Sequence, residues 1–413
     1  MIQINTTIKK SSLWDGIYIL LVCLNVFAKI LVSSNLSSFL GFTPESFEYR
    51  TLRITIYGLL LLFFAENKHS RRKIIILLAM AVCVVATYVN ANTLSFTLMF
   101  LLVASYPENL TVNRIAKHMF CVTAVGVIMI LCLFKTGYVD NNVMYRLDGM
   151  ERNSLGFSSP NAFANMVCYG LLMFMCWKGK KWTSSDFVIW LGILALVYKI
   201  TDGRMSCLVG FILILIEEIW RLKAVFSKNE SGKQKNNRVF YLVEGFLFEI
   251  GLALSLSLTL LYKKGLYMVY LSALDKLMSF RLSFMVKYFN DPGVTIWGNM
   301  IRTVTASGAA ATGEKWSGLD NSYMYMLIVW GIIATGIFAI LLIQLSRYHK
   351  EGQNKYDAIC VMGILVIAFS EASLFNVTSN IAIFMIAEMV SSKQVSVMEE
   401  KVNYENEIHT LGR

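Results

Sequence analysis

Charged residues are scarce in this chain of 413 residues. Asp, Glu, Lys and Arg make up 16% of it, whereas they make up about 25% of a typical soluble domain. Hydrophobic residues reach 56%, and they come in long runs rather than in stripes at helical spacing. This composition excludes an ordinary soluble domain and predicts a polytopic membrane protein. The net charge of +11 must then be counted by side of the membrane, and no aromatic-interleaved basic patch indicates nucleic acid.

The apolar runs predict the fold class. A span needs about 20 apolar residues to cross about 30 Å of hydrocarbon. We therefore predict an all-α transmembrane helical bundle of about twelve spans, which forms a single integral membrane domain over residues 1–413. The predicted spans lie near residues 13–33, 51–66, 74–91, 93–106, 118–135, 159–177, 186–201, 205–222, 239–261, 322–346, 356–374 and 376–391.

Basic residues assign the connections between spans to the two sides of the membrane. Cytoplasmic loops gather Lys and Arg, and this rule places both termini in the cytoplasm, together with a polar linker, 223–238, and the tail, 392–413. A first outer loop, 136–158, and a large outer loop, 263–320, then face outward. The first apolar run lacks a small-residue cleavage site, so we expect it to remain as a span. The sequence shows no soluble domain and no internal repeat.

Cysteine and histidine are missing from the predicted outer loops. All eight cysteines fall within apolar runs, so we expect neither a disulfide framework nor a thiolate metal site. The histidines all fall on the predicted cytoplasmic side, which argues against a histidine base or a histidine-ligated metal on the outer face. These histidines are His69, His118, His349 and His409.

The large outer loop supplies the first candidate site residue. If residues 276–289 form a short amphipathic helix, Arg281 falls inside its apolar sector. An arginine there must extend to the interface, pair with an acid or meet an anionic ligand. Guanidinium groups bind phosphate oxygens bidentately without a metal, which makes Arg281 a candidate phosphate ligand.

A second arginine, Arg204, follows Asp202 and Gly203 between two predicted spans. Asp202 can cap a helix, and Gly203 allows a tight turn. A cation at a helix N-terminus opposes the macrodipole, whereas an anion bound beside it would be stabilised by both. Arg204 is therefore either a phosphate ligand or the ion-pair partner of Asp202 or of another outer carboxylate.

The first outer loop contributes Arg152 and Asn161. Ser159 and Pro160 form a favourable N-cap and first-turn pair for the span that follows, which directs Asn161 toward the outer surface. Arg152, just before it, either completes an anion site or is a solvated loop residue.

Two carboxylates are candidate general bases. Asp320 precedes Asn321 at the start of the predicted span 322–346, where it is either a base or the N-cap of the helix. Glu371 lies near the outer end of the span 356–374. Acids within membranes are costly and often functional, although a helix-packing hydrogen bond would also explain Glu371.

The order of these motifs resembles that of the bacterial O-antigen and capsular repeat-unit polymerases of the O-antigen ligase superfamily. The resemblance covers residues 146–388. The spacing of Asn321 and Gly331 is similar to the ligase signature, in which a histidine commonly precedes the asparagine; Asp320 stands there here and favours a polymerase. The resemblance rests on Arg152-Asn153-Ser154-Leu155-Gly156-Phe157 with Pro160-Asn161, Asp202-Gly203-Arg204-Met205-Ser206, Ser279-Phe280-Arg281, Asp320-Asn321-Ser322-Tyr323 with Gly331 and Gly336, and Glu371 with Asn376 and Asn380.

The resemblance implies glycosyl transfer at the outer leaflet of the bacterial plasma membrane, during capsular, exopolysaccharide or O-antigen synthesis. A growing glycan on undecaprenyl pyrophosphate would be the donor, and a lipid-linked repeat unit the acceptor. No metal or other cofactor is expected, since pre-placed cations would stabilise the leaving pyrophosphate. A flippase and a chain-length regulator are expected partners. The implied site comprises Arg152, Arg204, Arg281, Asn161, Asn321 and Tyr323 for substrate binding, with Asp320, or else Glu371, as the general base.

Two alternatives remain open from the sequence. A ligase would move finished glycan onto another acceptor, and Asp320 in place of histidine argues against it. A flippase or another secondary transporter would also have about twelve spans and a basic cavity. Transporters usually repeat their architecture in two halves, and this sequence shows no such repeat.

Overall fold

The computed structural model describes residues 2–66, 69–145, 149–226, 238–304 and 317–392, and within them the fold is almost entirely helical. The only sheet in these ranges is an antiparallel hairpin of β1 (Val143–Tyr145) and β2 (Glu151–Asn153). The helices are α1 (Ile2–Val32), α2 (Leu36–Leu40), α3 (Phe47–Glu66), α4 (Arg71–Ala91), α5 (Ser95–Ser105), α6 (Val112–Lys135), α7 (Pro160–Lys178), η1 (Gly179–Lys181), α8 (Ser184–Thr201), α9 (Arg204–Phe226), α10 (Arg238–Lys263), α11 (Met268–Leu277), α12 (Arg281–Asn290), α14 (Ser322–Tyr325), the π-helical turn η3 (Met326–Trp330), α15 (Gly331–Gly352), α16 (Lys355–Ile367) and α17 (Ile381–Ser391).

The chain is an all-α protein with helices suited to a membrane. Six helical segments in the described ranges are long and apolar enough to cross a bilayer, while α5 and α17 are apolar but have only 11 residues each. The count of about twelve spans therefore stays a prediction. The six segments are Leu13–Val32, Arg71–Ala91, Val112–Lys135, Ser184–Thr201, Arg238–Lys263 and Ser322–Gly352.

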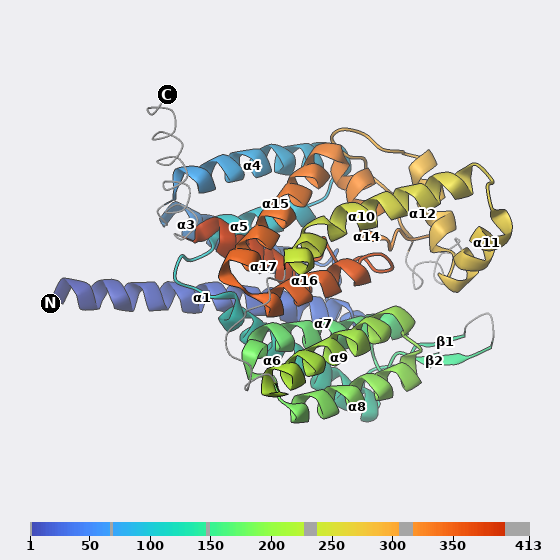
Figure 1. Cartoon of the computed structure of the whole chain (residues 1–413), viewed down its shortest axis with the longest axis horizontal. Helices are drawn as coiled ribbons and strands as arrows, with labels where there is room; N and C mark the ends of the chain where they lie inside the picture. The colour runs from blue at the N-terminus through green and yellow to red at the C-terminus, as the bar shows by residue number, and fades with distance from the viewer. Residues whose placement is uncertain (1, 67–68, 146–148, 227–237, 305–316, 393–413) are drawn as a thin grey trace.

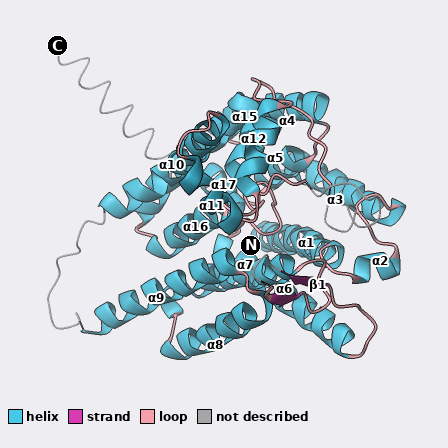
Figure 2. Ribbon diagram, turned by 90° about the vertical axis from the view of Figure 1, so that its right-hand side faces the viewer, coloured by secondary structure: helices cyan, strands magenta, loops and turns pink. Residues whose placement is uncertain are grey.

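The helices form two groups with α16 and α17 between them. Figure 2 shows α6, α7, α8 and α9 on one side and α4, α5, α10 and α15 on the other. Helix α17 is buried at every residue except Glu388, because its sequence is apolar all round. Helices α8 and α10 bury one face and leave apolar side chains exposed on the other, as helices in contact with lipid do.

The two predicted outer loops lie at the same end of the bundle. Figure 1 shows β1 and β2, from the first loop, at the end that also carries α11 and α12, from the large loop. We call this the hairpin end. Its placement outside the cell stays a prediction. Residues 146–148 and 305–316 of these loops lie outside the described residues, as do 227–237 of the predicted linker and 393–413 of the predicted tail.

The single amphipathic helix predicted over 276–289 is wrong. The chain instead turns between α11 and α12, where Ser279 and Phe280 have φ values of 57° and 64°. The buried carboxylate of Asp275 stabilises the turn by accepting hydrogen bonds from the backbone N–H groups of Leu282 and Ser283, at 2.9 and 3.1 Å. No glycine or proline marks the turn in the sequence, and so periodicity missed it. Arg281 is thus the first residue of α12.

A close backbone contact explains Gly331. The segment before Asn299 packs against η3, where Asn299 N–H donates to the carbonyl of Ile328 at 2.8 Å. Gly331 has a φ of 81°, and a Cβ there would lie 2.3 Å from the backbone nitrogen of Gly298. The predicted continuous helix from residue 322 is therefore divided into α14, η3 and α15. The spacing of Asn321 and Gly331 has a structural basis independent of any ligand.

Candidate functional site

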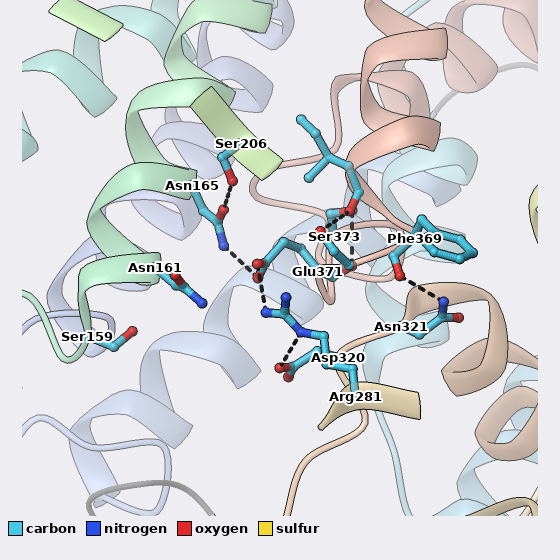
Figure 3. A network of polar contacts seen from close by, with 12 residues as sticks. Ser159, Asn161, Asn165, Ser206, Arg281, Asp320, Asn321, Phe369, Glu371 and Ser373 are labelled. Carbon is cyan, nitrogen blue, oxygen red and sulfur yellow. Dashed lines mark hydrogen bonds and ion pairs between the residues drawn. The ribbon is translucent and has the colours of Figure 1, made fainter. Parts of the chain in front are cut away.

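Arg281 lies between two carboxylates at the hairpin end. Its Nε donates to Asp320 Oδ2 at 3.2 Å, and its Nη2 donates to Glu371 Oε1 at 2.9 Å. The side chains of Arg281 and Glu371 are 11% and 12% exposed, whereas that of Asp320 is 31% exposed. Figure 3 shows that the three side chains converge from α12, from the segment before α14 and from the connection between α16 and α17.

Hydrophobic packing brings α12 to this position. Leu282 and Met285, on the buried face of α12, belong to the same small core as Met324 and Ile328. This core fixes the start of α12 beside the start of α14, where Asp320 lies. Arg281 therefore meets Asp320 because two short helices pack together, and not because of an amphipathic pattern.

Asn321 caps α14, the role that the sequence had left open for Asp320. The Asn321 side-chain oxygen accepts a hydrogen bond from the N–H of Met324 at 2.8 Å, and its amide nitrogen donates to the carbonyl of Phe369 at 2.8 Å and to Ser255 Oγ at 3.0 Å. These bonds use the polar atoms of a side chain that is 0% exposed. Asp320 is therefore not needed as the cap and is available for chemistry.

Tyr323 and Ser322 also have structural positions. The Tyr323 hydroxyl donates to the carbonyl of Leu365 at 2.6 Å, and the residue is 1% exposed. The Ser322 hydroxyl donates to the carbonyl of Glu371 at 2.6 Å and accepts from the N–H of Ser373 at 2.8 Å. The motif from Asn321 to Tyr323 thus holds the connection that carries Glu371. The structure gives Asn321 and Tyr323 positioning roles in place of the predicted substrate contacts.

Glu371 joins the two groups of helices. Its Oε2 accepts a hydrogen bond from Asn165 of α7 at 2.8 Å, and the Asn165 side-chain oxygen accepts one from the Ser206 hydroxyl (Figure 3). Both Glu371 oxygens are therefore engaged, so the packing role considered from the sequence is present. Burial raises the pKa of the Glu371 carboxyl above its ordinary value of 4.5, although the neighbouring Arg281 opposes that shift.

Asp320 differs from Glu371 in having a free oxygen. Its Oδ2 is paired with Arg281, and its Oδ1 has no partner among the described residues. Asp320 is also the more exposed of the two carboxylates. Of the two predicted bases, Asp320 has the geometry to accept a proton from a ligand.

Arg152 and Asn161 are in contact with each other. Arg152 Nη2 donates to Asn161 Oδ1, and Arg152 Nε donates to the carbonyl of Thr201 at 2.7 Å. Asn161 lies one helical turn before Asn165 on α7, so this pair is adjacent to the Glu371 network along the helix. The structure brings Arg152 near the site without joining it to Arg281.

Arg204 pairs with Asp202, the alternative that the sequence left open. Arg204 Nε lies 3.2 Å from Asp202 Oδ1, and the arginine side chain is 39% exposed. Asp202, and not Gly203, adopts the left-handed conformation of the turn, with a φ of 45°. Gly203 is required for packing, because a Cβ there would lie 2.5 Å from the Cβ of Ala164 on α7.

A cavity of about 160 Å³ lies beside the Arg281 cluster. Asp320, Glu371 and Asn165 line it, together with residues of α1 and of the connection from Ala372 to Ser379. One lining residue, Lys29 of α1, was not among the predicted site residues. A lysine inside an apolar run was the signal that could have identified it, because charges within membrane segments are costly and often functional.

The chain matches no protein-family model, and searches of curated proteins and solved structures gave no match either. Function must therefore be inferred from the motif order and from the geometry of this site.

Proposed function

We propose that the protein is a polymerase that joins undecaprenyl-pyrophosphate-linked oligosaccharide repeat units at the outer leaflet of the bacterial plasma membrane. The observation that carries the proposal is Asp320, which lines a cavity at the hairpin end, is held by Arg281 through one oxygen and has no partner for the other among the described residues. The order of motifs along the chain supplies the substrate class, and the site supplies a base and cations for transfer without a metal.

The proposed reaction needs one proton acceptor. A sugar hydroxyl of the acceptor attacks the anomeric carbon of the donor, and the bond from that carbon to the pyrophosphate oxygen breaks. The electron pair of that bond leaves with the pyrophosphate, and the hydroxyl proton passes to Asp320. A general base must reach the hydroxyl within hydrogen-bond distance, and Asp320 lines the cavity with one carboxylate oxygen that has no partner among the described residues.

Arg281 and Glu371 position the base. Arg281 holds one oxygen of Asp320, Glu371 holds Arg281, and Asn165 fixes the other oxygen of Glu371. The guanidinium also reduces the repulsion between the two carboxylates that it contacts. Each side chain in this hydrogen-bonded series thus restrains the next.

The cavity is large enough for the reacting groups of the two substrates but not for their glycan chains. The cavity volume is about 160 Å³. That volume accommodates the reacting groups but not an oligosaccharide. The glycan and the lipid tail would therefore lie outside the cavity, which agrees with a polymerase whose substrates are long and remain attached to the membrane.

The test supplies the purified protein with a synthetic lipid-pyrophosphate repeat unit, in the presence of chelator and without a partner enzyme. A ladder of products that is lost in Asp320→Asn supports the polymerase. One transferred block on a foreign acceptor would instead identify a ligase. Movement of the substrate across a vesicle without new bonds would identify a flippase. Absence of all three would reject a role in handling this substrate class.

A further inference from the structure

Lys29 is a cation without an internal partner in the candidate site. It lies in the last turn of α1, and it lines the same cavity as Asp320 and Glu371. Among the described residues, no hydrogen-bond or ion-pair partner of its ammonium group is found. A lysine near the end of an apolar helix ordinarily extends along the helix to reach the membrane surface. Lys29 instead lines a cavity that is also lined by two carboxylate residues, Asp320 and Glu371.

The paired charges in the site are net negative without Lys29. Arg281 contributes one positive charge to the cluster, and Asp320 and Glu371, when ionised, contribute two negative charges. This cluster would repel an anionic group that enters the cavity. Since the Arg281 charge is shared between two carboxylates, an incoming anion requires a further cation. Among the residues that line the cavity, Lys29 is the one lysine or arginine.

Asn376 supplies a second donor to the same cavity. Its side-chain oxygen accepts a hydrogen bond from the Thr378 hydroxyl at 2.7 Å, and its amide nitrogen has no partner among the described residues. Both Asn376 and Lys29 line the cavity. An ammonium group with three N–H donors and an amide NH₂ group are together suited to phosphate oxygens.

We propose that Lys29 and Asn376 bind the diphosphate group of the lipid-linked substrate. The proposal rests on the proposed function and assigns the group that holds the charged part of the donor. Lys29 and Asn376 bind the diphosphate, while Asp320 takes the proton of the acceptor hydroxyl. Arg281 is then chiefly the residue that orients Asp320.

Binding measurements separate this proposal from turnover. The purified full-length protein is titrated with undecaprenyl diphosphate, with inorganic diphosphate and with the uncharged polyprenol, and affinity is read from ligand-induced changes in fluorescence. Lys29→Gln removes one charge-assisted contact, so the Kd of this variant for undecaprenyl diphosphate should rise at least about tenfold. Lys29→Arg keeps the charge and should retain most of the affinity. Lys199→Gln is the matched control, because Lys199 is also a lysine in the last turn of an apolar helix, α8, but is exposed outside the cavity.

The outcomes test diphosphate binding and polymerisation separately. Tighter binding of undecaprenyl diphosphate than of inorganic diphosphate, lost in Lys29→Gln and kept in Lys199→Gln, supports the proposal. Equal affinity for the two diphosphates would assign the site to a free phosphate and overturn the lipid-linked part. Unchanged affinity in Lys29→Gln overturns the proposal even if the protein polymerises its substrate. Lys29-dependent binding without any polymer would keep the binding site and reject the polymerase.

Discussion

Two buried contacts between a carboxylate and a basic side chain lie near opposite ends of α10, and they differ in what surrounds them. At the start of α10, Glu244 Oε1 lies 2.6 Å from His349 Nδ1, and the two side chains are 1% and 2% exposed. At the hairpin end, Arg281 and Glu371 are 2.9 Å apart, and Glu371 lines a cavity with the more exposed Asp320. Neither Glu244 nor His349 lines that cavity.

The comparison shows why a buried ion pair does not by itself identify a site. Burying two charges costs free energy, which their attraction offsets only when the geometry is good and further hydrogen bonds are present. The pair of Glu244 and His349 is enclosed between α10 and α15, so its effect is confined to packing. Glu244 Oε2 also lacks a hydrogen-bond partner among the described residues, but it is buried away from the cavity. The Arg281 cluster differs in having an open volume beside its unpaired carboxylate oxygen.

Replacing the proposed base should give the largest difference in activity between a substitution at the hairpin end and one in the Glu244–His349 contact. We expect Asp320→Asn to lower the rate of polymerisation by roughly 10²–10⁴-fold, because an amide cannot accept the proton. The rate is measured on purified protein from the product ladder. Glu244→Gln is the control: it should lower the thermal unfolding temperature and leave the rate per folded molecule unchanged. An Asp320→Asn variant with normal turnover would remove Asp320 from the mechanism.

Removing the shared cation should cost stability as well as activity. Arg281→Gln leaves two carboxylates side by side without a counter-charge, and breaking such a pair costs roughly 3 kcal/mol, the lower end of the range for buried pairs, since Asp320 is 31% exposed. Arg204→Gln is the comparison variant, and it should cost less than Arg281→Gln, because the Arg204 side chain is 39% exposed and water can replace part of its contact with the buried Asp202. Denaturant titration in detergent compares the two. Equal losses would show that Arg281 is no more important than a surface arginine.

The raised pKa of Glu371 predicts opposite effects of acid on activity and on stability. As the pH falls through that pKa, Glu371 becomes neutral and releases Arg281, so activity should fall by about tenfold per pH unit, beginning above the ordinary carboxyl value of 4.5. The folded protein binds this proton more tightly than the unfolded chain, so the contribution of Glu371 to stability rises over the same range. A pH–rate profile measures the first effect and unfolding curves the second. Glu371→Gln should lose this pH dependence; an unchanged acid limb would exclude Glu371 as its cause.

A packing variant should give the smallest effect. Gly203→Ala would place a Cβ 2.5 Å from Ala164, and moving α9 from α7 should cost about 1 kcal/mol and reduce activity through the bond between Ser206 and Asn165. Gly192→Ala on α8 is the control, because a Cβ there meets nothing within 4 Å. Thermal unfolding and the rate are measured for both. If Gly203→Ala behaves like Gly192→Ala, α7 does not couple the turn to the site.

Much of the site was accessible from the sequence because charged residues beside apolar runs are few. Glu371 was identified on that basis, Asp320 from its position before Asn321 at the start of a predicted span, and Arg281 from an amphipathic helix that the structure divides in two. The structure places Arg281 in direct contact with both carboxylates. Their partners were harder to predict. Asp202 was a foreseeable partner of Arg204 because it is two residues away, whereas Glu371 reaches Arg281 only after α10, α12, α14 and α16 have packed.

The sequence alone determined that this is a helical membrane protein and where most of its apolar helices lie, because hydrophobic runs and their lengths are local properties of the chain. The tertiary structure decided which charges are paired and which remain available. It placed the turn before Arg281 through the carboxylate of Asp275, gave the cap of α14 to Asn321, and brought Lys29 from the first helix to the wall that Asp320 shares. These outcomes depend on contacts between segments far apart in the sequence, and no local pattern encodes them.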